Sequence, residues 1–213
     1  MARSASRPRR RGVVPDSIEG VCTVVLAAGQ GSRYREHHDE DKLLSPSTDA
    51  LDASPILAET LSALSGVTER LLVVTRDDNQ PLLAWLDQIG EGLDAEILSV
   101  RSNGLGHSLA QAVAHQSARR GWLVALGDMP YVRRESIARI AAAIQPQRLV
   151  VPTYRGQRGH PRGIGAHYLD QLLMLGDDRG AQGLFVDPQV IEIELDDPGV
   201  LQDIDRPGDR RPD

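Results

Sequence analysis

The sequence is poor in several residue types, and each shortage excludes a class of protein. A single cysteine, Cys22, among 213 residues excludes a disulfide framework and a cysteine-rich zinc site. Aromatic residues make up only 3% of the chain, which argues against a protein that stacks nucleic-acid bases. No apolar run approaches the roughly 20 residues of a membrane span. We therefore expect neither a nucleic-acid partner nor a membrane partner.

Charge is unevenly distributed along the chain. Five of the 24 basic residues are arginines in the first eleven positions, whereas all 30 acidic residues come later. The acidic remainder is a poor match for duplex DNA. Asp16 and Glu19 follow the arginines where a secretory signal would have an apolar stretch, so we expect a cytoplasmic protein. The sequence predicts a disordered basic tail over 1–17, a single domain over 18–208 and a short tail over 209–213.

Lysine is nearly absent. Of the 24 basic residues, 23 are arginine and the exception is Lys42. Such a bias is compositional, but a lysine kept against it can mark a position where arginine does not fit. An ammonium group is a compact point charge, whereas a guanidinium group is a broad planar fork. Composition alone leaves chance and function both open for Lys42, which we expect in a polar loop.

Apolar runs alternate with helical patterns over most of the chain. The continuous β-branched run over 21–27 is typical of a parallel strand that is buried on both faces. Similar runs occur over 71–75, 95–100, 122–126 and 149–151. Between them, helical patterns occur over 54–66, 81–90, 107–119 and 137–144, the first with Ser54 as N-cap and Pro55 as the first helical residue. This alternation predicts an α/β fold with a doubly wound, mostly parallel sheet.

The pattern changes after Pro152. Five glycines and prolines between positions 154 and 165 predict a loop or ribbon rather than a regular strand. Two short helical segments follow, and a late strand is expected over 190–195. We expect this part of the chain to form a lid or side wall of the same domain.

Ligands of open α/β sheets bind beyond the carboxyl ends of the strands, so residues that follow strands are candidates for a site. The glycine-rich loop over 27–33 offers successive N–H groups to an anion, and Arg33 suits phosphate. Tyr34 stands where a dinucleotide-binding turn has its third glycine, which argues against NAD. Asp128 could hold Mg²⁺ or only shape a turn. Residues 104–108 could contact a base and ribose or form a plain glycine turn.

Eight segments resemble, in order, the MobA-like nucleotidyltransferases. The resemblance lies in the signature loop (26–33), the lysine motif (41–44), a helix start (55–57), a base-side segment (104–109), the metal aspartate (127–130), two acceptor-side motifs (159–161 and 178–182) and a closing segment (203–209). Within the family, the chain is most similar to the molybdenum cofactor cytidylyltransferases. Ala28 and the Gly159-His160-Pro161 motif resemble the CTP-using branch, whereas the GTP-using branch typically has glycine in place of Ala28.

The resemblance implies a Rossmann-like nucleotidyltransferase fold and a specific reaction. CMP would pass from CTP to the phosphate of the molybdopterin cofactor, pyrophosphate would be released, and a molybdenum enzyme would be the partner that receives the product. It implies catalytic roles for Arg33, Lys42 and Asp128, with Mg²⁺ held by Asp128 and Asp205. The implied nucleotide-binding residues are Ala27, Ala28, Gly29, Gly31, Ser32, Arg33, Lys42, Gly104, Gly106 and Ser108.

The acceptor side is where the sequence departs from the family pattern. The resemblance implies acceptor binding by His160, Pro161, Arg179 and Gly180. Gln182 stands where the family's acceptor motif usually has arginine, and Arg162 or Arg179 could replace that charge. Two alternatives therefore stay open: a nucleotidyltransferase of the same fold that uses GTP or another acceptor, and a non-catalytic carrier of the molybdenum cofactor.

Overall fold

The computed structural model describes residues 17–29, 31, 34, 41–90, 92–176, 180–186 and 190–212. Nearly all of the predicted basic tail lies outside these residues. Within the described part, no helix is long and apolar enough to cross a membrane. One eight-stranded sheet has the order β3-β2-β1-β4-β7-β5-β6, and β8 pairs with β5. The α/β prediction and the single domain are confirmed.

The first four strands form a parallel half-sheet with β1 at its centre. They are β1 (Ile18–Leu26), β2 (Thr68–Arg76), β3 (Glu96–Val100) and β4 (Gly121–Leu126). Val25 of β1 pairs with Val73 on one side and with Ala125 on the other. From Val21 to Leu26 every residue of β1 is buried, because helices cover both faces. This explains the continuous apolar run in the sequence.

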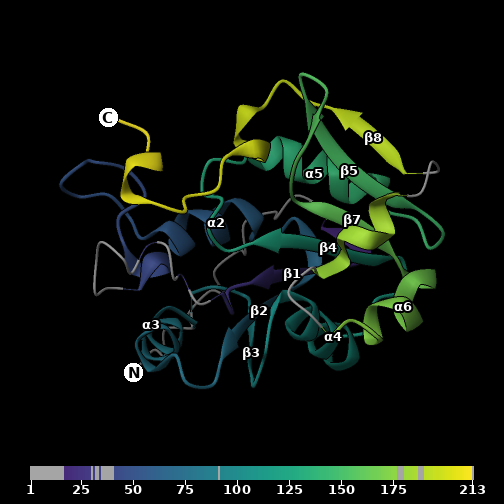
Figure 1. The fold of residues 1–213 in the computed structure, drawn as a ribbon, viewed down its shortest axis with the longest axis horizontal. Helices are drawn as coiled ribbons and strands as arrows, with labels where there is room; N and C mark the ends of the chain where they lie inside the picture. Colours follow the sequence, from purple (N-terminus) through teal and green to yellow (C-terminus); the bar gives the residue numbers. More distant parts are fainter. Residues whose placement is uncertain are drawn as a thin grey trace, which may run out of the picture.

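Helices cover the sheet on two sides. One face carries α2 (Ile56–Leu64), α3 (Gln80–Gly90) and α5 (Arg134–Ala143), whose apolar residues pack with Val21 and Val25. The other carries α4 (Leu105–His115), α6 (Leu169–Leu173) and the 3₁₀ helix η3 (Gly180–Val186), which pack with Cys22 and Val24. Figure 1 shows α4 and α6 next to each other beyond one face of the sheet. Alternate residues of β1 thus belong to two separate cores.

The prediction of a loop or ribbon over 154–165 is wrong for residues 162–165, which form a regular strand. The chain forms β5 (Leu149–Tyr154), the short β6 (Gln157–Arg158) and β7 (Arg162–Gly165), and β7 runs antiparallel between β4 and β5. Gly163 and Gly165 are required by close packing rather than by a turn. A Cβ on Gly163 would lie 2.6 Å from Ile144 Cγ1, and one on Gly165 would lie 2.2 Å from the carbonyl oxygen of Pro146.

Several predicted boundaries also shift. Pro55 is the N-cap of α2 rather than its first residue, because the amide of Ile56 donates to the carbonyl of Ser45 instead of to a Ser54 cap. Helix α4 begins two residues earlier than expected and ends at His115. The late strand is confirmed as β8 (Ile191–Glu194), which pairs parallel with β5.

Candidate active site

The carboxyl ends of β1 and β4 lie side by side and bring two predicted loops together. Leu26 and Leu126 are register partners at the ends of these strands. Beyond them, the amide of Gly127 donates to the carbonyl oxygen of Leu26 at 3.0 Å. A Cβ on Gly127 would lie 3.3 Å from that same oxygen, so glycine permits the close approach. The glycine-rich loop after β1 therefore meets Asp128 at one edge of the sheet.

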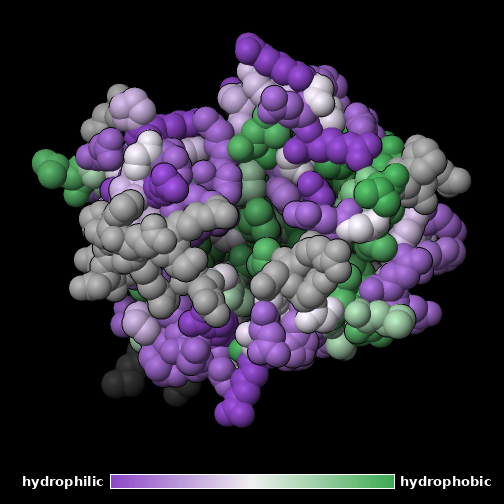
Figure 2. All heavy atoms as spheres, in the orientation of Figure 1, coloured by the Kyte–Doolittle hydropathy of each residue, from purple (hydrophilic) through white to green (hydrophobic). Residues whose placement is uncertain are grey.

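A cavity of about 340 Å³ opens at this edge. Its lining includes seven residues that the sequence singled out, namely Ala27, Gly29, Gly31, Tyr34, Lys42, Asp128 and Asp205. Figure 2 shows hydrophobic atoms in a hollowed strip near the middle of the view. Ala28 is buried but does not line this cavity. The cavity combines backbone from a glycine-rich loop with charged side chains, as a phosphate-bearing ligand requires.

Lys42 forms the charged centre of the site. Its Nζ donates to Asp128 Oδ2 at 2.7 Å and to Asp205 Oδ1 at 3.2 Å. Burial by itself would lower the pKa of Lys42, but the charges and hydrogen bonds of Asp128 and Asp205 outweigh it and the pKa is raised. The side chain of Lys42 is therefore protonated and positively charged at neutral pH. The expectation of a loop position needs correcting, because Lys42 begins the 3₁₀ helix η1 (Lys42–Leu44) and its side chain is only 11% exposed.

Three carboxylates gather beside this lysine. One oxygen each from Asp128, Asp203 and Asp205 lies within 4.8 Å of the others. Asp128 Oδ1 is buried and has no hydrogen-bond partner in the described part of the chain. Burial and the charges of Asp128 and Asp205 raise the pKa of Asp203. An orphaned carboxylate oxygen beside two further carboxylates fits a hard divalent cation such as Mg²⁺ or Mn²⁺.

Asp203 begins the predicted closing segment (203–209), but the resemblance assigned it no role at the metal, although its spacing from Asp205 carried a signal. Ile204 is fully buried, and its amide donates to the carbonyl oxygen of Asp128 at 3.0 Å. This contact anchors the segment that carries both Asp203 and Asp205. Asp203 and Asp205 are therefore carried to Asp128 together.

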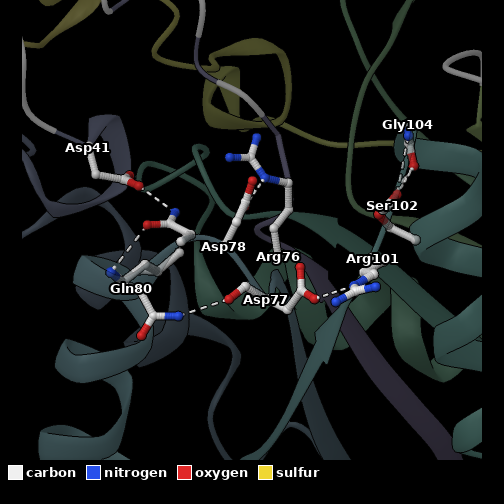
Figure 3. Close-up of polar contacts among 11 residues, drawn as sticks. Asp41, Arg76, Asp77, Asp78, Gln80, Arg101, Ser102 and Gly104 are labelled. Carbon is white, nitrogen blue, oxygen red and sulfur yellow. Dashed lines mark hydrogen bonds and ion pairs between the residues drawn. The ribbon is translucent and has the colours of Figure 1, made fainter.

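A chain of hydrogen bonds holds the segment that carries Lys42 against the loop after β2. Asp41 caps η1, because its Oδ1 accepts from the amide of Leu43 at 2.9 Å. Asp41 Oδ2 accepts from Nδ2 of Asn79 at 2.5 Å, and Asn79 Oδ1 accepts from the amide of Leu82 at 3.3 Å. Asn79 is almost fully buried between β2 and α3. Figure 3 shows the dashed contact between Asp41 and this amide. The loop after β2 thus holds the segment that carries Lys42.

Most of the segment over 104–108, which the resemblance places at the nucleotide base, does not line the cavity. Ser108 is buried, and its hydroxyl donates to Ser102 Oγ at 2.7 Å and lies 3.2 Å from the carbonyl oxygen of Gly104. Figure 3 shows Ser102 and Gly104 beside the Arg101–Asp77 ion pair of 2.9 Å. Leu105 lines the cavity, whereas Gly104, Gly106 and Ser108 do not. Ser108 shapes the loop in this structure, and contact of this segment with a base stays a prediction.

A second, smaller cavity of about 110 Å³ adjoins the first and shares Leu26, Leu105 and Leu126 with it. His160 and Gly180, two of the predicted acceptor residues, line it, while Pro161 does not. Burial, with a smaller effect from Arg162, lowers the pKa of His160 to about 4. The imidazole is therefore neutral at pH 7. Ser32, Arg33 and Arg179 lie outside the described residues, so their predicted roles stay predictions.

Fold and cleft together place the chain among α/β enzymes that act on phosphorylated ligands at the carboxyl edge of a sheet. Residues 23–191 match the MobA-like NTP transferase domain, and the chain belongs to this family. The matched residues therefore form a nucleotidyltransferase domain. The broad assignment made from the sequence motifs is confirmed.

The chain is also similar in sequence to curated proteins. The chain is 32% identical over 178 residues to the bifunctional protein GlmU of Rhodopseudomonas palustris strain BisB5, a match that covers 81% of this chain and 36% of that protein. It spans about a third of the length of such curated relatives.

Three solved structures, of two proteins, share the fold. Rv0371c of Mycobacterium tuberculosis H37Rv superposes with a TM-score of 0.71 at 23% identity, covering 89% of this chain and 95% of that one. A second structure of Rv0371c is a complex with manganese and has a TM-score of 0.66 at 21% identity, with 89% and 95% covered. A nucleotidyl transferase from Methanothermobacter, Mth528, has a TM-score of 0.70 at 24% identity, covering 89% and 93%. At these identities the likeness shows the fold alone.

The contact between Asp41 and Asn79 gives a prediction about the placement of Lys42. Asn79→Asp sets two carboxylates against each other, and we expect kcat of nucleotidyl transfer to fall about 10-fold. The exchange of both side chains, Asp41→Asn with Asn79→Asp, restores one donor and one acceptor. We expect it to recover kcat to within about 3-fold of wild type. Steady-state kinetics and thermal melting of the three proteins test this, and an exchanged protein as slow as the single variant would contradict it.

Proposed function

We propose that the enzyme transfers CMP from CTP to the phosphate of the molybdopterin cofactor and releases pyrophosphate. The observation that carries the catalytic part is the cluster of Lys42, Asp128, Asp203 and Asp205 at the cavity where β1 and β4 end. The choice of CTP and of a molybdopterin acceptor is supported by Ala28 and by the Gly159-His160-Pro161 motif, which resemble those of the cytidylyltransferase branch.

In the proposed reaction an oxygen of the acceptor phosphate attacks the α-phosphorus of CTP. A new P–O bond forms, the bond from the α-phosphorus to the bridging oxygen breaks, and pyrophosphate leaves with that electron pair. The acceptor phosphate is already ionised near neutral pH, so no general base is needed. This agrees with a neutral His160 that lies in the adjoining cavity. Because both reactants are anions, the protein's task is to align them and to neutralise charge.

Each charged group then has a defined task. The backbone of Ala27, Gly29 and Gly31, with Ser32 and Arg33, would hold the triphosphate. Asp128 and Asp205, with Asp203 beside them, would hold Mg²⁺, which when bound supplies positive charge to the phosphate oxygens. The ammonium group of Lys42 lies 2.7 Å from Asp128 and would compensate charge that moves onto pyrophosphate.

The choice of nucleotide gives a second prediction. We expect the wild-type enzyme to prefer CTP over GTP, because Ala28 resembles the CTP-using branch, whereas the GTP-using branch typically has glycine at this position. Ala28→Gly should narrow the ratio of the kcat/KM values for CTP and GTP by about 10-fold. Parallel kinetics with CTP and GTP measure this ratio. Equal kcat/KM values for the two nucleotides in wild type would remove Ala28 as a specificity residue.

One assay separates the proposed function from its alternatives. Pyrophosphate release is measured with Mg²⁺ and CTP, GTP or ATP, with and without molybdopterin. Release that needs both CTP and molybdopterin supports the proposal, and the product would then be ready for a molybdenum enzyme. Release with GTP, or only with a different phosphorylated acceptor, identifies another nucleotidyltransferase of this fold. Tight binding of the cofactor without release under any condition would identify a carrier.

A further inference from the structure

The smaller cavity beside the carboxylate cluster has a mainly apolar wall. Leu109 of α4, Val124 of β4 and Phe185 of η3 form much of it, together with the three leucines that it shares with the larger cavity. The two cavities therefore adjoin at Leu26, Leu105 and Leu126, where the strands end. A molecule whose phosphate reaches Asp128 could extend its remaining part into this second space.

Arg162 is the charged side chain in this apolar wall. It belongs to β7, and its Nε donates to the carbonyl oxygen of Gly159 at 3.2 Å. Its guanidinium carbon lies 4.9 Å from the centroid of the Phe185 ring. A guanidinium group that lies over an aromatic ring keeps its edge free for a planar pair of acceptor atoms.

This arginine has no counter-ion in the part of the chain that the structure describes. Its neighbour Arg158 is paired with Glu192 at 2.6 Å, whereas no carboxylate of the described residues pairs with Arg162. His160, which is neutral, carries no negative charge that could neutralise Arg162. Burial and the charge of Arg158 lower the pKa of Arg162, which shows that the cation lies in surroundings that do not favour it. A half-buried cation without a partner fits an anion brought by a ligand.

We propose that Arg162 is a specificity-determining residue that binds a second anionic group of the acceptor, separate from the phosphate that attacks CTP. The inference rests on the proposed function and extends it. It defines the acceptor as a phosphate ester whose body packs against the apolar wall and whose distal group bears a pair of negatively charged hydrogen-bond acceptor atoms. Simple phosphate esters without that second group are then poor substrates.

The test uses variants at positions 162 and 182, two of the polar residues that line this cavity. Arg162→Gln removes the charge and should raise KM for molybdopterin about 10- to 100-fold, with the Kd of CTP and Mg²⁺ by calorimetry unchanged. Arg139→Gln, on the exposed side of α5 and outside both cavities, is the matched control and should leave KM unchanged. Adding Gln182→Arg to Arg162→Gln returns a guanidinium to the cavity and should recover part of the lost affinity. Arg162→Lys provides a second variant if the first melts at lower temperature.

A direct probe separates this inference from the proposed function. The protein is saturated with Mg²⁺ and a non-hydrolysable CTP analogue, and binding of inorganic sulfate is measured in wild type and in Arg162→Gln. Sulfate binding that disappears in the variant supports the site even if molybdopterin proves not to be the acceptor. Turnover of molybdopterin with the same KM in wild type and in both Arg162 variants would overturn the inference and leave the proposed function intact. The absence of Arg162-dependent binding in both assays would also overturn it.

Discussion

Asp128→Asn should lower the rate of nucleotidyl transfer by about 10²–10⁴-fold, the largest effect that we expect from a single substitution in this site. Asparagine is nearly isosteric and can still accept from Lys42, whose Nζ lies 2.7 Å from Asp128 Oδ2. The change removes the negative charge and converts the orphaned buried oxygen into part of a neutral amide, which is a weak ligand for a hard cation. Single-turnover rates over a range of Mg²⁺ and Mn²⁺ concentrations measure the loss.

Two further variants show whether the loss of activity is specific to Asp128. Asp87→Asn, on the exposed side of α3, should turn over like wild type with the same melting temperature. Asp203→Asn should weaken metal activation less than Asp128→Asn does, because Asp203 is exposed and Asp128 is not. Near-normal turnover of Asp128→Asn at saturating Mg²⁺ would remove Asp128 from the metal site.

Lys42→Ala is expected to have the second-largest effect, with a loss of about 10²-fold that falls mostly on kcat. A contact that strengthens as charge moves to the leaving pyrophosphate acts on the transition state more than on binding. Lys42→Arg keeps the charge, yet it should lose about 10-fold, because a planar guanidinium does not fit the space of an ammonium between two carboxylates. Kinetics with varied CTP separate kcat from KM. Wild-type turnover in Lys42→Arg would mean that the lone lysine is a compositional accident.

The same substitution has a stability readout. Lys42 is 11% exposed and is paired with Asp128 and Asp205, so removing it leaves neighbouring carboxylates without their counter-charge. We expect Lys42→Ala to lose about 1–2 kcal/mol of stability in a chelator, less than a fully buried ion pair would cost. Added Mg²⁺ should restore much of it, because a cation bound by the folded state stabilises that state. Melting curves in chelator and in Mg²⁺ test both expectations.

The sequence predicted most of the parallel half-sheet and the residues that follow its strands. This was possible because β1 is buried on both faces and leaves a continuous apolar run, and because ligands of such sheets bind where the strands end. Asp128 and Asp205 lie 77 positions apart in the sequence, and only the motif order suggested that they meet. The structure brings both onto the same lysine.

The parts that could not be predicted depend on contacts between distant segments. Glycines at 163 and 165 favoured a loop because local propensity does not show that a helix end packs against them. The role of Asn79 was not visible for the same reason, since its partner Asp41 lies in another loop. The place of Asp203 beside Asp128 was not predicted because its neighbour Ile204, not the aspartate itself, holds that segment in place.

The four residues of strand β7 alternate between two environments, a tightly packed face and a cavity-lining face. Gly163 and Gly165 face the end of α5 and the turn that follows it, where any added atom would clash. Arg162 and Ile164 project to the opposite face and line the smaller cavity. A lineage of such enzymes can therefore exchange the cavity-facing positions and acquire a different acceptor without rebuilding the sheet. The same alternation offers a route to engineered variants, in which positions 162 and 164 are randomised while both glycines are kept.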